Sequence, residues 1–525
     1  MMSTRVGFLS LCLMLPAATA PAQIVDAVVA DVVRDAQAAG VAGAGITATN
    51  EQSGISRSVR SDAEGRYHLP PSPAGIYTFR VQRQGFRTIV RLHQTLNVGS
   101  TSTIDFTFEA VTTSDTVTVT AGAVLEATTH TLSRLISRGE LDALPLVDWN
   151  FNGLATITPG VTPTGIYGGV DISGARDFQN AYNVDGASAE GTSLGDQRLA
   201  YAQDWIQEFQ VLASQFSVEF GRASGGVLNA ITRSGSNRYA TRAHGYFRNE
   251  AWDAKPFFAA AKLPLSSARW GGTTGGPVRC DAVFYFAGVE RLDRDTAAVV
   301  NTSFPEANGS KPITTAQTLA LGKVEWFRGQ SALRFRVNAD AAHTTNAGIG
   351  GVVTEENGTT VDWHAAEALA SWSRPLAGGF NELRTAFSTT ASDTACNFAR
   401  THAQGTWFGR SYPAAQFGCP TGFGWIDGSE WQLIDNLSWV HGGHAIKAGA
   451  SVSRARNSGD FAQVRVTKLL PFGSGRRAAV LLEIYNAMNA VNLTTYIGSL
   501  ESLQFGLPSV ALDPRRVQLG FRIDF

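Results

Sequence analysis

The sequence predicts a mainly β protein that is exported and ends in a membrane-spanning antiparallel β-barrel. The last nine residues alternate strictly between polar or glycine residues and the apolar Val517, Leu519, Phe521, Ile523 and Phe525. Because a strand points alternate side chains to opposite faces, this segment has one apolar and one polar face. In an outer-membrane barrel these faces meet lipid and lumen, and the last strand closes the barrel without a free edge. An amphipathic edge strand of a soluble sheet is the alternative interpretation.

The N-terminus predicts an export signal over residues 1–22. Arg5 supplies a positive charge, and residues 6–15 form an apolar run that is too short to span a bilayer. Two small-x-small cleavage sites follow, at residues 18–20 and 20–22. A buried N-terminal helix is the alternative. No later stretch of sequence approaches the roughly 20 uninterrupted apolar residues of a membrane helix. We therefore expect either a barrel or a protein that is soluble outside the inner membrane.

The composition agrees with a barrel and argues against one class of function. The chain of 525 residues is long enough for several domains, and it contains 54 glycines and 10% aromatic residues. Its net charge of −1 argues against a general nucleic-acid binder. We therefore expect no nucleic acid among its partners.

The four cysteines show neither a disulfide framework nor a zinc-binding spacing. Cys12 would leave with the export signal, and Cys280 has no evident partner in the sequence. Cys396 and Cys419 share a loop-like region rich in Gly, Pro and aromatic residues, where they could form a local disulfide in an oxidising compartment. We expect no metal and no cofactor.

Residues 23–111 are predicted to form a small β-sandwich. Its regular part begins at Ala42, after a short Val/Ala/Asp segment, and turns rich in Gly, Asn, Pro and Ser separate its strands. The expected strands are 46–49, 76–81, 89–92 and 102–108.

Three motifs in this region have the order of a known domain family. They are the turn Asp62-x-x-Gly65-x-Tyr67, the strand Pro73-x-Gly75-x-Tyr77 and the corner Gly85-Phe86. Together they resemble the carboxypeptidase regulatory-like domain, whose fold is a transthyretin-like β-sandwich. That family is often grouped with carbohydrate-binding-like folds, but no cluster of aromatic residues in this sequence indicates sugar binding.

Residues 112–234 open with an extended, mostly polar segment that has no core partner nearby in the sequence. It comprises Asp115, Thr116, Val117, Thr118, Val119, Thr120 and Ala121. A connecting strand or linker is the plain interpretation. The segment also resembles the TonB box of TonB-dependent receptors, which has the form D-T-x-x-V-T-A. An exposed segment of this kind can add as a strand to the edge of a partner's sheet. The resemblance therefore implies a periplasmic contact with TonB.

A series of motifs follows in a fixed order. They are Leu-Pro-Leu-Val-Asp-Trp at 144–149, Thr-Pro-Gly-Val at 158–161, Ile-Ser-Gly-Ala-Arg at 172–176, Asn-Val-Asp-Gly at 183–186, Phe-Ser-Val-Glu-Phe-Gly-Arg at 216–222 and Gly-Gly-Val-Leu-Asn at 225–229. This order resembles the plug of TonB-dependent receptors of the Oar-like type, which also carry a regulatory-like domain before the plug. The resemblance implies an α+β plug shaped by Asn183, Asp185, Gly186, Glu219, Gly221, Gly225 and Gly226. The glycines allow tight turns and close backbone approach.

Residues 235–525 are predicted to form a transmembrane antiparallel β-barrel. Its strands are amphipathic; for example, the apolar Leu333, Phe335 and Val337 alternate with polar neighbours. Polar, Gly-rich segments such as residues 296–318 separate the strands, and we expect these segments to be surface loops. A soluble β-rich domain is the alternative interpretation.

The predicted barrel is shortened. The resemblance implies 22 strands, which need about 220 residues at about ten residues each. The region offers about 290 residues and must also supply every turn and loop. Residues 444–449 resemble a mid-barrel strand, whereas residues 464–489 resemble the last strands. We therefore suspect that a central block of strands is missing near residues 453–461.

No catalytic residue is predicted, and we expect that the protein is not an enzyme. His364 and Glu367 have the H-x-x-E spacing of zinc carboxypeptidases, but on a strand they would point to opposite faces. His441 and His444 flank a turn, and a hairpin explains them better than a metal site. The sequence shows no nucleophile elbow and no phosphate loop.

The resemblance implies a receptor in the cell outer membrane that transports an unidentified extracellular ligand. TonB, with its inner-membrane energising complex, would engage residues 115–121 and shift the plug. The barrel-assembly machinery would recognise residues 517–525, and outer-membrane lipid would surround the barrel. Three alternatives stay open: a surface-binding or adhesion protein that does not transport, a degenerate receptor remnant, and a periplasmic peptidase with a regulatory-like domain.

Overall fold

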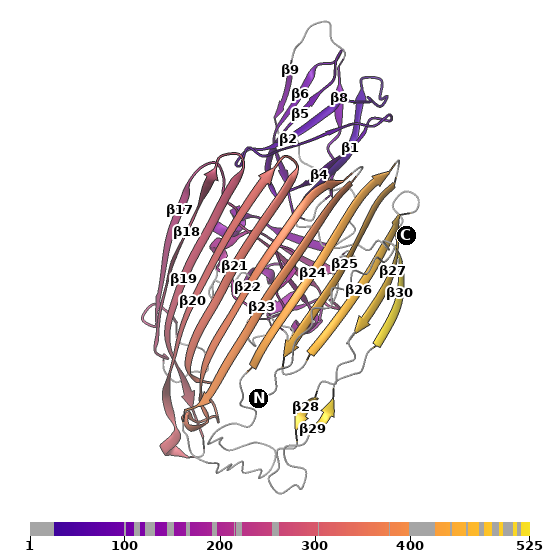
Figure 1. The fold of residues 1–525 in the computed structure, drawn as a ribbon. Coiled ribbons are helices and arrows are strands. Elements are labelled where there is room, and N and C mark those ends of the chain that lie inside the picture. Colours follow the sequence, from indigo (N-terminus) through magenta and orange to yellow (C-terminus); the bar gives the residue numbers. More distant parts are fainter. Residues whose placement is uncertain are drawn as a thin grey trace, which may run out of the picture.

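The computed structural model consists of an N-terminal β-sandwich, a plug of short strands and helices, and a large antiparallel sheet that packs against the plug (Figure 1). The structure describes residues 26–98, 101–109, 116–120, 132–143, 152–163, 169–191, 197–214, 216, 223–254, 262–302, 304–376, 379–397, 426–441, 444–457, 460–471, 477–485, 493–496, 508–511 and 516–524.

The N-terminal sandwich consists of two sheets. One has the strand order β4-β1-β7, with β8 also paired to β1, and the other has the order β3-β2-β5-β6-β9. The strands are β1 (Ala27–Asp35), β2 (Gly45–Asn50), β3 (Ser56–Arg60), β4 (Arg66–Ser72), β5 (Gly75–Gln82), β6 (Thr88–Leu96), β7 (Thr101–Ser102), β8 (Phe106–Phe108) and β9 (Thr116–Thr120). Ile46, Leu69, Phe79 and Phe106 belong to one fully buried apolar core. The predicted sandwich fold is confirmed.

Two details of the sandwich differ from the predicted strands. The Val/Ala/Asp segment before Ala42 is strand β1, and its Val29 and Val33 belong to the core. Residues 102–108 form two short strands, β7 and β8, instead of one. β1 pairs with β4, β7 and β8, all distant in sequence. Local sequence pattern therefore could not reveal that β1 is a strand.

The Asp-x-x-Gly-x-Tyr turn of the sandwich has a clear physical basis. Asp62 accepts hydrogen bonds from the main-chain N–H groups of Glu64 and Arg66, and these bonds close the turn. Gly65 has a φ of +80°, and a Cβ atom there would lie 2.5 Å from the carbonyl oxygen of Val33. Both the left-handed backbone and the lack of space require glycine at this position.

The plug contains a five-stranded sheet and two short α-helices. The sheet order is β10-β15-β16-β13-β14, and β13 and β16 run parallel. The elements are β10 (Leu132–Ile136), α1 (Arg138–Ala143), α2 (Asn152–Ala155), β11 (Val161–Pro163), β12 (Val170–Ile172), η1 (Asp177–Gln179), β13 (Ala181–Val184), β14 (Ala187–Ser188), η2 (Gln203–Trp205), β15 (Ile206–Ser214) and β16 (Val227–Thr232). In the described part of the chain, no helix has the length and apolar character needed to cross a membrane.

The large sheet has twelve strands that pair in sequence order from β17 to β27, followed by β30. They are β17 (Ala240–Asn249), β18 (Leu265–Arg279), β19 (Val283–Val300), β20 (Gly309–Arg328), β21 (Ser331–Ala347), β22 (Thr359–Leu376), β23 (Gly379–Cys396), β24 (Ile426–His441), β25 (His444–Asn457), β26 (Asp460–Pro471), β27 (Arg477–Tyr485) and β30 (Arg516–Asp524). The 3₁₀ turns η3 (Pro305–Ala307) and η4 (Glu355–Asn357) lie between its strands, and β28 (Leu493–Tyr496) pairs separately with β29 (Pro508–Ala511).

The prediction that residues 296–318 form a surface loop is wrong. β19 continues to Val300 and β20 begins at Gly309, so only residues 301–308 connect the two strands. The strands are longer than a membrane requires, and their distal parts carry polar side chains. Polarity does not end a strand there, because the antiparallel ladder still pairs the backbone groups.

Among the described residues this sheet has twelve strands, fewer than the 22 that the resemblance implies. β25 and β26 pair as a hairpin across residues 453–461, where missing strands were suspected. Among the described residues, β17 and β30 each pair with one neighbour within this sheet. The sheet is therefore compatible with a barrel, and the described strands leave one edge at each end.

The polarity of the large sheet is inverted relative to a soluble protein. On β21, Phe335 and Val337 are 49% and 59% exposed, whereas the intervening Arg336 and the following Asn338 are buried. β20 shows the same inversion, with Lys323 and Glu325 buried and apolar residues exposed between them. An apolar outer face and a charged inner face are what a lipid-embedded barrel wall requires.

Exposed tryptophans mark one end of this apolar face. Trp326, Trp372 and Trp439 lie a few residues from the short connections β20–β21, β22–β23 and β24–β25. These connections lie at the end of the sheet that carries the sandwich (Figure 1). Aromatic girdles form at the interfaces of barrels with the membrane, where amphipathic rings meet both lipid and water. The tryptophans therefore indicate where the membrane ends on the sandwich side.

We expect Val337→Arg to destabilise the sheet in lipid by about 2–4 kcal/mol, because an arginine near the bilayer midplane loses its hydration. Thr314→Arg is the matched control, since Thr314 is also exposed but lies near the distal end of β20. It should cost about 0–1 kcal/mol. Urea titration of the protein refolded into lipid vesicles measures both values. Equal costs for the two variants would contradict the proposed membrane position.

Candidate functional site

The site centres on the tight turn between β13 and β14 of the plug. Asp185 and Gly186 have φ values of +49° and +76°, the left-handed pair that a two-residue hairpin turn needs. The Asp185 carboxylate accepts hydrogen bonds from the Thr232 main-chain N–H at 2.9 Å and from the Thr232 hydroxyl at 2.6 Å. These bonds attach the turn to β16 and fix the direction of the carboxylate.

Asp185 also pairs with two cations of the large sheet. It accepts a hydrogen bond from Arg336 Nη1 at 2.7 Å, and Lys323 Nζ lies 3.9 Å from its other oxygen. Burial alone would raise the pKa of Asp185, but Lys323, Arg336 and the bonds from Thr232 outweigh it and lower that pKa to about 2. Asp185 therefore stays ionised and links the plug to the wall at any physiological pH.

A buried arginine of the plug makes the opposite contact. Arg198 bonds to the wall carboxylates Glu367 at 3.4 Å and Glu430 at 2.5 Å, and all three side chains are almost fully buried. Glu367 also pairs with Arg336. The plug thus presents one anion and one cation to the wall, and the wall supplies the complementary charge to each. Such charge-assisted bonds fix orientation as well as contact.

A second group of ion pairs connects the plug to β17, the first strand of the sheet. Asp142 of α1 lies 2.6 Å from Arg242 Nη1, and Asp204 of η2 lies 2.8 Å from His244 Nδ1. Burial raises the pKa of Asp204, but the hydrogen bond from His244 and the nearby arginines lower it far more. The plug is therefore held to the wall by charges at two separate places.

The sandwich docks at the end of the sheet that carries the short turns. Ile55 packs in one buried cluster with Phe284, Phe327 and Ala332 of the sheet. Arg57 Nη1 donates a hydrogen bond to the Gly329 carbonyl oxygen in the β20–β21 turn at 2.9 Å. The sandwich therefore lies over this end of the sheet.

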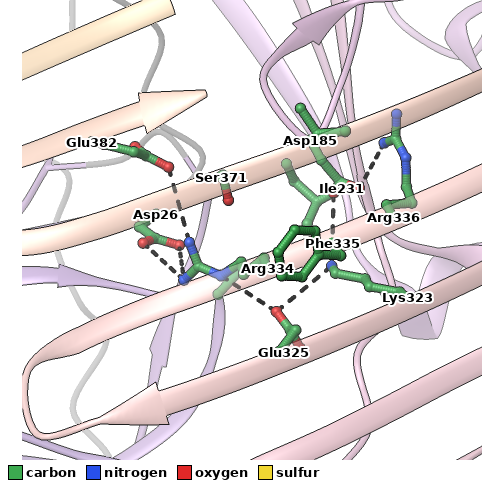
Figure 2. Close-up of a pocket in the computed structure, with 12 residues that line it drawn as sticks. Asp26, Asp185, Ile231, Lys323, Glu325, Arg334, Phe335, Arg336, Ser371 and Glu382 are labelled. Carbon is green, nitrogen blue, oxygen red and sulfur yellow. Dashed lines mark hydrogen bonds and ion pairs between the residues drawn. The ribbon is translucent and has the colours of Figure 1, made fainter. Parts of the chain in front are cut away.

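The sandwich also contacts the plug directly. The main-chain N–H of Val98 donates to Glu208 Oε2 on β15 at 3.0 Å. Burial raises the pKa of Glu208 to about 7, and the Val98 bond offsets only part of that effect. Sandwich, plug and sheet meet around a cavity of about 50 Å³ that Asp26, Asp185 and Arg334 help to line (Figure 2).

The chemistry of this site is attachment by ion pairs. Within the described part of the chain, no group of three or more His, Cys, Asp or Glu side chains could hold a metal ion. The charged groups are instead matched across domain boundaries. Pairs of this kind can break and form again when one domain moves relative to another.

The structure brings some predicted plug residues together. Asn183 is buried on β13 beside the Asp185–Gly186 turn. Before β16, a Cβ atom on Gly225 would lie 2.5 Å from Asn180 Oδ1, and one on Gly226 would lie 2.5 Å from a methyl carbon of Ile172. Both glycines therefore serve close packing. The predicted Glu219 and Gly221 lie outside the described residues.

Sequence analysis missed most of the charged residues of the site. The missed residues are Arg198 of the plug and Lys323, Arg336, Glu367 and Glu430 of the sheet. A signal was present for the residues on strands, because a charged side chain at a lumen-facing position of an amphipathic strand needs a partner when a plug fills the lumen. Their partners could not be assigned, because the pairs lie far apart in sequence.

The predicted TonB box contains an ordered strand. Thr116–Thr120 forms β9, which pairs in parallel with β6 at the edge of the sandwich sheet, while Asp115 and Ala121 lie outside the described residues. The segment therefore has a structural partner that its local sequence did not indicate. Its other edge has no strand beside it among the described residues.

The remaining sequence predictions fall on the sheet. Val517, Leu519, Phe521 and Ile523 lie on β30, which pairs with β27, and Phe525 lies outside the described residues. Cys396 ends β23 and is disulfide-bonded. Its predicted partner Cys419 lies outside the described residues, so that pairing stays a prediction.

The two declined metal motifs lie on strands. On β22, His364 is exposed while Glu367 is buried in the lumen, which confirms that they point to opposite faces. His441 and His444 are directly opposite each other at the end of the β24–β25 hairpin, as predicted. His364 and Glu367 are therefore not arranged to ligate one metal ion.

Two family models match the chain. The carboxypeptidase regulatory-like domain matches residues 30–109, and the outer membrane beta barrel domain matches residues 231–392. The TonB-dependent transporter Oar of Myxococcus xanthus is 25% identical over 260 residues, which cover 46% of this chain and 24% of that protein. The chain therefore carries a carboxypeptidase regulatory-like domain followed by an outer membrane beta barrel domain, and over its aligned part it is similar to a TonB-dependent transporter. Its aligned part spans about a quarter of the length of this curated relative.

Solved structures of outer-membrane receptors are similar in fold. The outer membrane transporter YddB of Escherichia coli has a TM-score of 0.49 and 14% identity, covering 68% of this chain and 55% of that one. The siderophore receptor PirA of Acinetobacter baumannii has a TM-score of 0.49 and 12% identity, covering 67% and 56%. These likenesses are too distant to carry an argument about ligands.

The two matched domains confirm two predictions. The protein is mainly β with a regulatory-like domain, and it is located in the outer membrane. The relatives that match it are named as transporters and receptors and not as enzymes.

We expect Asp185→Asn to loosen the plug. The substitution leaves Arg336 and Lys323 buried with less counter-charge, and removing one partner of a buried ion pair costs about 3–5 kcal/mol. The urea concentration at which the plug becomes sensitive to protease measures the effect in the purified receptor. Asp171→Asn is the control, because Asp171 is a half-buried plug carboxylate on β12. Equal resistance of both variants would contradict the role of Asp185.

We expect the docking of the sandwich to weaken as pH rises. The folded pKa of Glu208 lies above its ordinary value of 4.5, so protonation favours the folded state, and that stabilisation is lost as pH rises towards 7. The total change is at most about 3 kcal/mol. Urea unfolding at pH 5 and pH 8 measures it. Glu208→Gln stays neutral at both pH values and should remove this part of the pH dependence. If the free energy of unfolding changed equally between pH 5 and pH 8 in the wild type and in Glu208→Gln, Glu208 would not be responsible for the pH dependence.

Proposed function

We propose that the chain is a TonB-dependent receptor that admits an unidentified extracellular ligand through the outer membrane when its plug shifts. The observation that carries the proposal is the way the plug is held. Asp185 and Arg198 bind the wall through ion pairs with Arg336, Glu367 and Glu430. The plug also shares a buried apolar cluster with Phe286, Leu319 and Leu321 of the sheet. The ion pairs are the part of the attachment that entry of water weakens, because the attraction between charges falls as the dielectric constant rises.

The proposed domain division follows the same scheme. Residues 1–22 are the export signal, 23–111 the regulatory-like sandwich, 112–234 the TonB box and plug, and 235–525 the barrel. The outer-membrane lipid surrounds the barrel, and the last strand directs insertion by the barrel-assembly machinery.

The proposed contact with TonB is the strand β9. What supports it is the position of β9 at a sheet edge, with β6 on one side and no strand on the other among the described residues. A strand of TonB can add to that edge through main-chain hydrogen bonds. A pull by the inner-membrane energising complex would then act first on the sandwich to which β9 belongs.

A second candidate function is surface binding without transport. The observation that favours it is the number of strands in the described part of the sheet, which is twelve where the resemblance implies 22. A degenerate receptor remnant would share this feature. Binding of TonB distinguishes these alternatives from an energised receptor, because neither a passive binder nor a remnant needs that contact.

We expect the purified receptor to capture the periplasmic C-terminal domain of TonB, and the double substitution Val117→Pro/Val119→Pro to abolish capture. Proline removes main-chain donors and cannot extend a ladder. The control is Thr118→Ala/Thr120→Ala, which keeps the main chain and should bind nearly as well as the wild type. Isothermal titration calorimetry measures all three affinities. Absence of binding by the wild type would contradict the proposed function.

A further inference from the structure

The Asp185 latch is the set of ion pairs that join Asp185 of the plug to Arg336 and Lys323 of the sheet. We propose that the N-terminal sandwich is a seal that keeps water away from this latch, so that undocking the sandwich releases the plug. The proposal goes beyond the proposed function, because the seal is defined by contacts within this chain. Only the idea that TonB pulls the sandwich away depends on the function proposed above. An experiment can therefore contradict the seal without contradicting the proposed function, and the reverse.

The cavity between the three domains provides the first argument. Its lining includes Asp26 and Ala74 from the sandwich, Asp185 and Ile231 from the plug, and several residues of the sheet (Figure 2). The sandwich therefore forms part of the wall of the cavity onto which the latch faces. Removing the sandwich would leave that side open to solvent.

Asp26 provides the second argument, because it extends the ion pairs of the latch into the sandwich. It is 4% exposed and binds Arg334 Nη2 at 3.1 Å. Arg334 pairs with Glu325 at 3.3 Å, and Glu325 lies 3.8 Å from Lys323. Lys323 in turn lies 3.9 Å from Asp185. A continuous line of alternating charges therefore runs from the sandwich to the plug (Figure 2).

The ion pairs in this line are stronger when water is excluded from the cavity. The attraction between charges is inversely proportional to the effective dielectric constant, which is about 20 for sites near a protein surface and about 80 in water. Wetting the cavity would therefore weaken each pair about fourfold. The 3.8 Å and 3.9 Å contacts of Lys323 are longer than direct hydrogen bonds, so a water molecule beside each pair could hydrogen-bond to both charges once the cavity is wetted.

The mixed character of the docking contact provides the third argument. Among the described residues, a buried apolar cluster at this contact consists of Ile55, Phe284, Phe327 and Ala332. Polar contacts accompany it, including the Arg57 bond to Gly329 and the Val98 bond to Glu208. Domains joined by small, polar contacts move relative to each other unless a large hydrophobic interface prevents it. This contact is therefore suited to reversible undocking.

Hydrogen–deuterium exchange of the full receptor tests the proposal at a single amide. The Thr232 N–H is the reporter, because it donates to the buried Asp185 carboxylate. The variant Ile55→Glu/Arg57→Glu places two carboxylates against Phe327 and the Gly329 carbonyl oxygen, and it should undock the sandwich. We expect Thr232 to exchange about tenfold faster in this variant than in the wild type.

Two controls separate release of the latch from general unfolding. The Gly226 N–H donates to Asn180 Oδ1 within the plug and should keep its protection in the same variant. Ile76→Glu places a carboxylate on the sandwich at a residue that is 38% exposed, and it should leave Thr232 exchange unchanged.

A reversible cross-link completes the test. Asn237 and Ser53 lie side by side across the docking contact, where Asn237 Nδ2 donates to the Ser53 carbonyl oxygen at 2.7 Å. Ser53→Cys/Asn237→Cys, with the free Cys280 changed to Ser, should restore slow exchange to the undocked variant when oxidised and lose it again on reduction. Thr232 exchange at the wild-type rate in Ile55→Glu/Arg57→Glu, or equal exchange in the oxidised and reduced cross-linked forms, would overturn the proposal.

Discussion

The inverted polarity of the large sheet is the constraint on which the rest of the structure depends. A wall that is apolar outside must carry its charged side chains inside, as Lys323, Arg336 and Glu367 do. Charges enclosed without partners would cost far more than any strand pairing could offset. The lumen must therefore contain complementary charge, and the plug supplies it through Asp185 and Arg198. The plug, the wall and their ion pairs are thus one electrostatic unit.

These ion pairs fix the orientation of the plug more than they add to the stability of the protein. A buried ion pair adds little net stability compared with a well-packed apolar contact, yet it strongly penalises any arrangement in which one partner is lost. The plug is therefore held in one position, and hydration of its charges would weaken the charged part of this attachment. The sandwich is attached in a similar way. Asp26 forms an ion pair with Arg334 in the charged interior, and Ile55 packs in a small apolar cluster with residues of the sheet. Its edge strand β9 places the predicted TonB box on the domain that covers the latch.

Much of the fold could be predicted because it is determined by short stretches of adjacent residues. The Asp62 turn, the Asp185–Gly186 turn and the alternation around Phe335 each follow from a few adjacent residues. What could not be predicted depends on distant pairing. β1 is a strand because β4, β7 and β8 pair with it. The polar residues 296–318 are mostly strand because a ladder supports them. The Arg336 partner of Asp185 lies 151 positions away in the sequence, so only the folded wall brings the two together.

The most direct measurement is the electrophoretic mobility of the full chain, expressed with residues 1–22, in isolated outer membranes after a urea wash. A sheet held by a continuous ladder around a charged plug should resist urea, and its mobility should change only on heating. That result would show that these strands close into a stable membrane barrel. A product that urea extracts, with the same mobility before and after heating, would contradict the account, because it would mean that the twelve strands do not enclose the plug in the membrane.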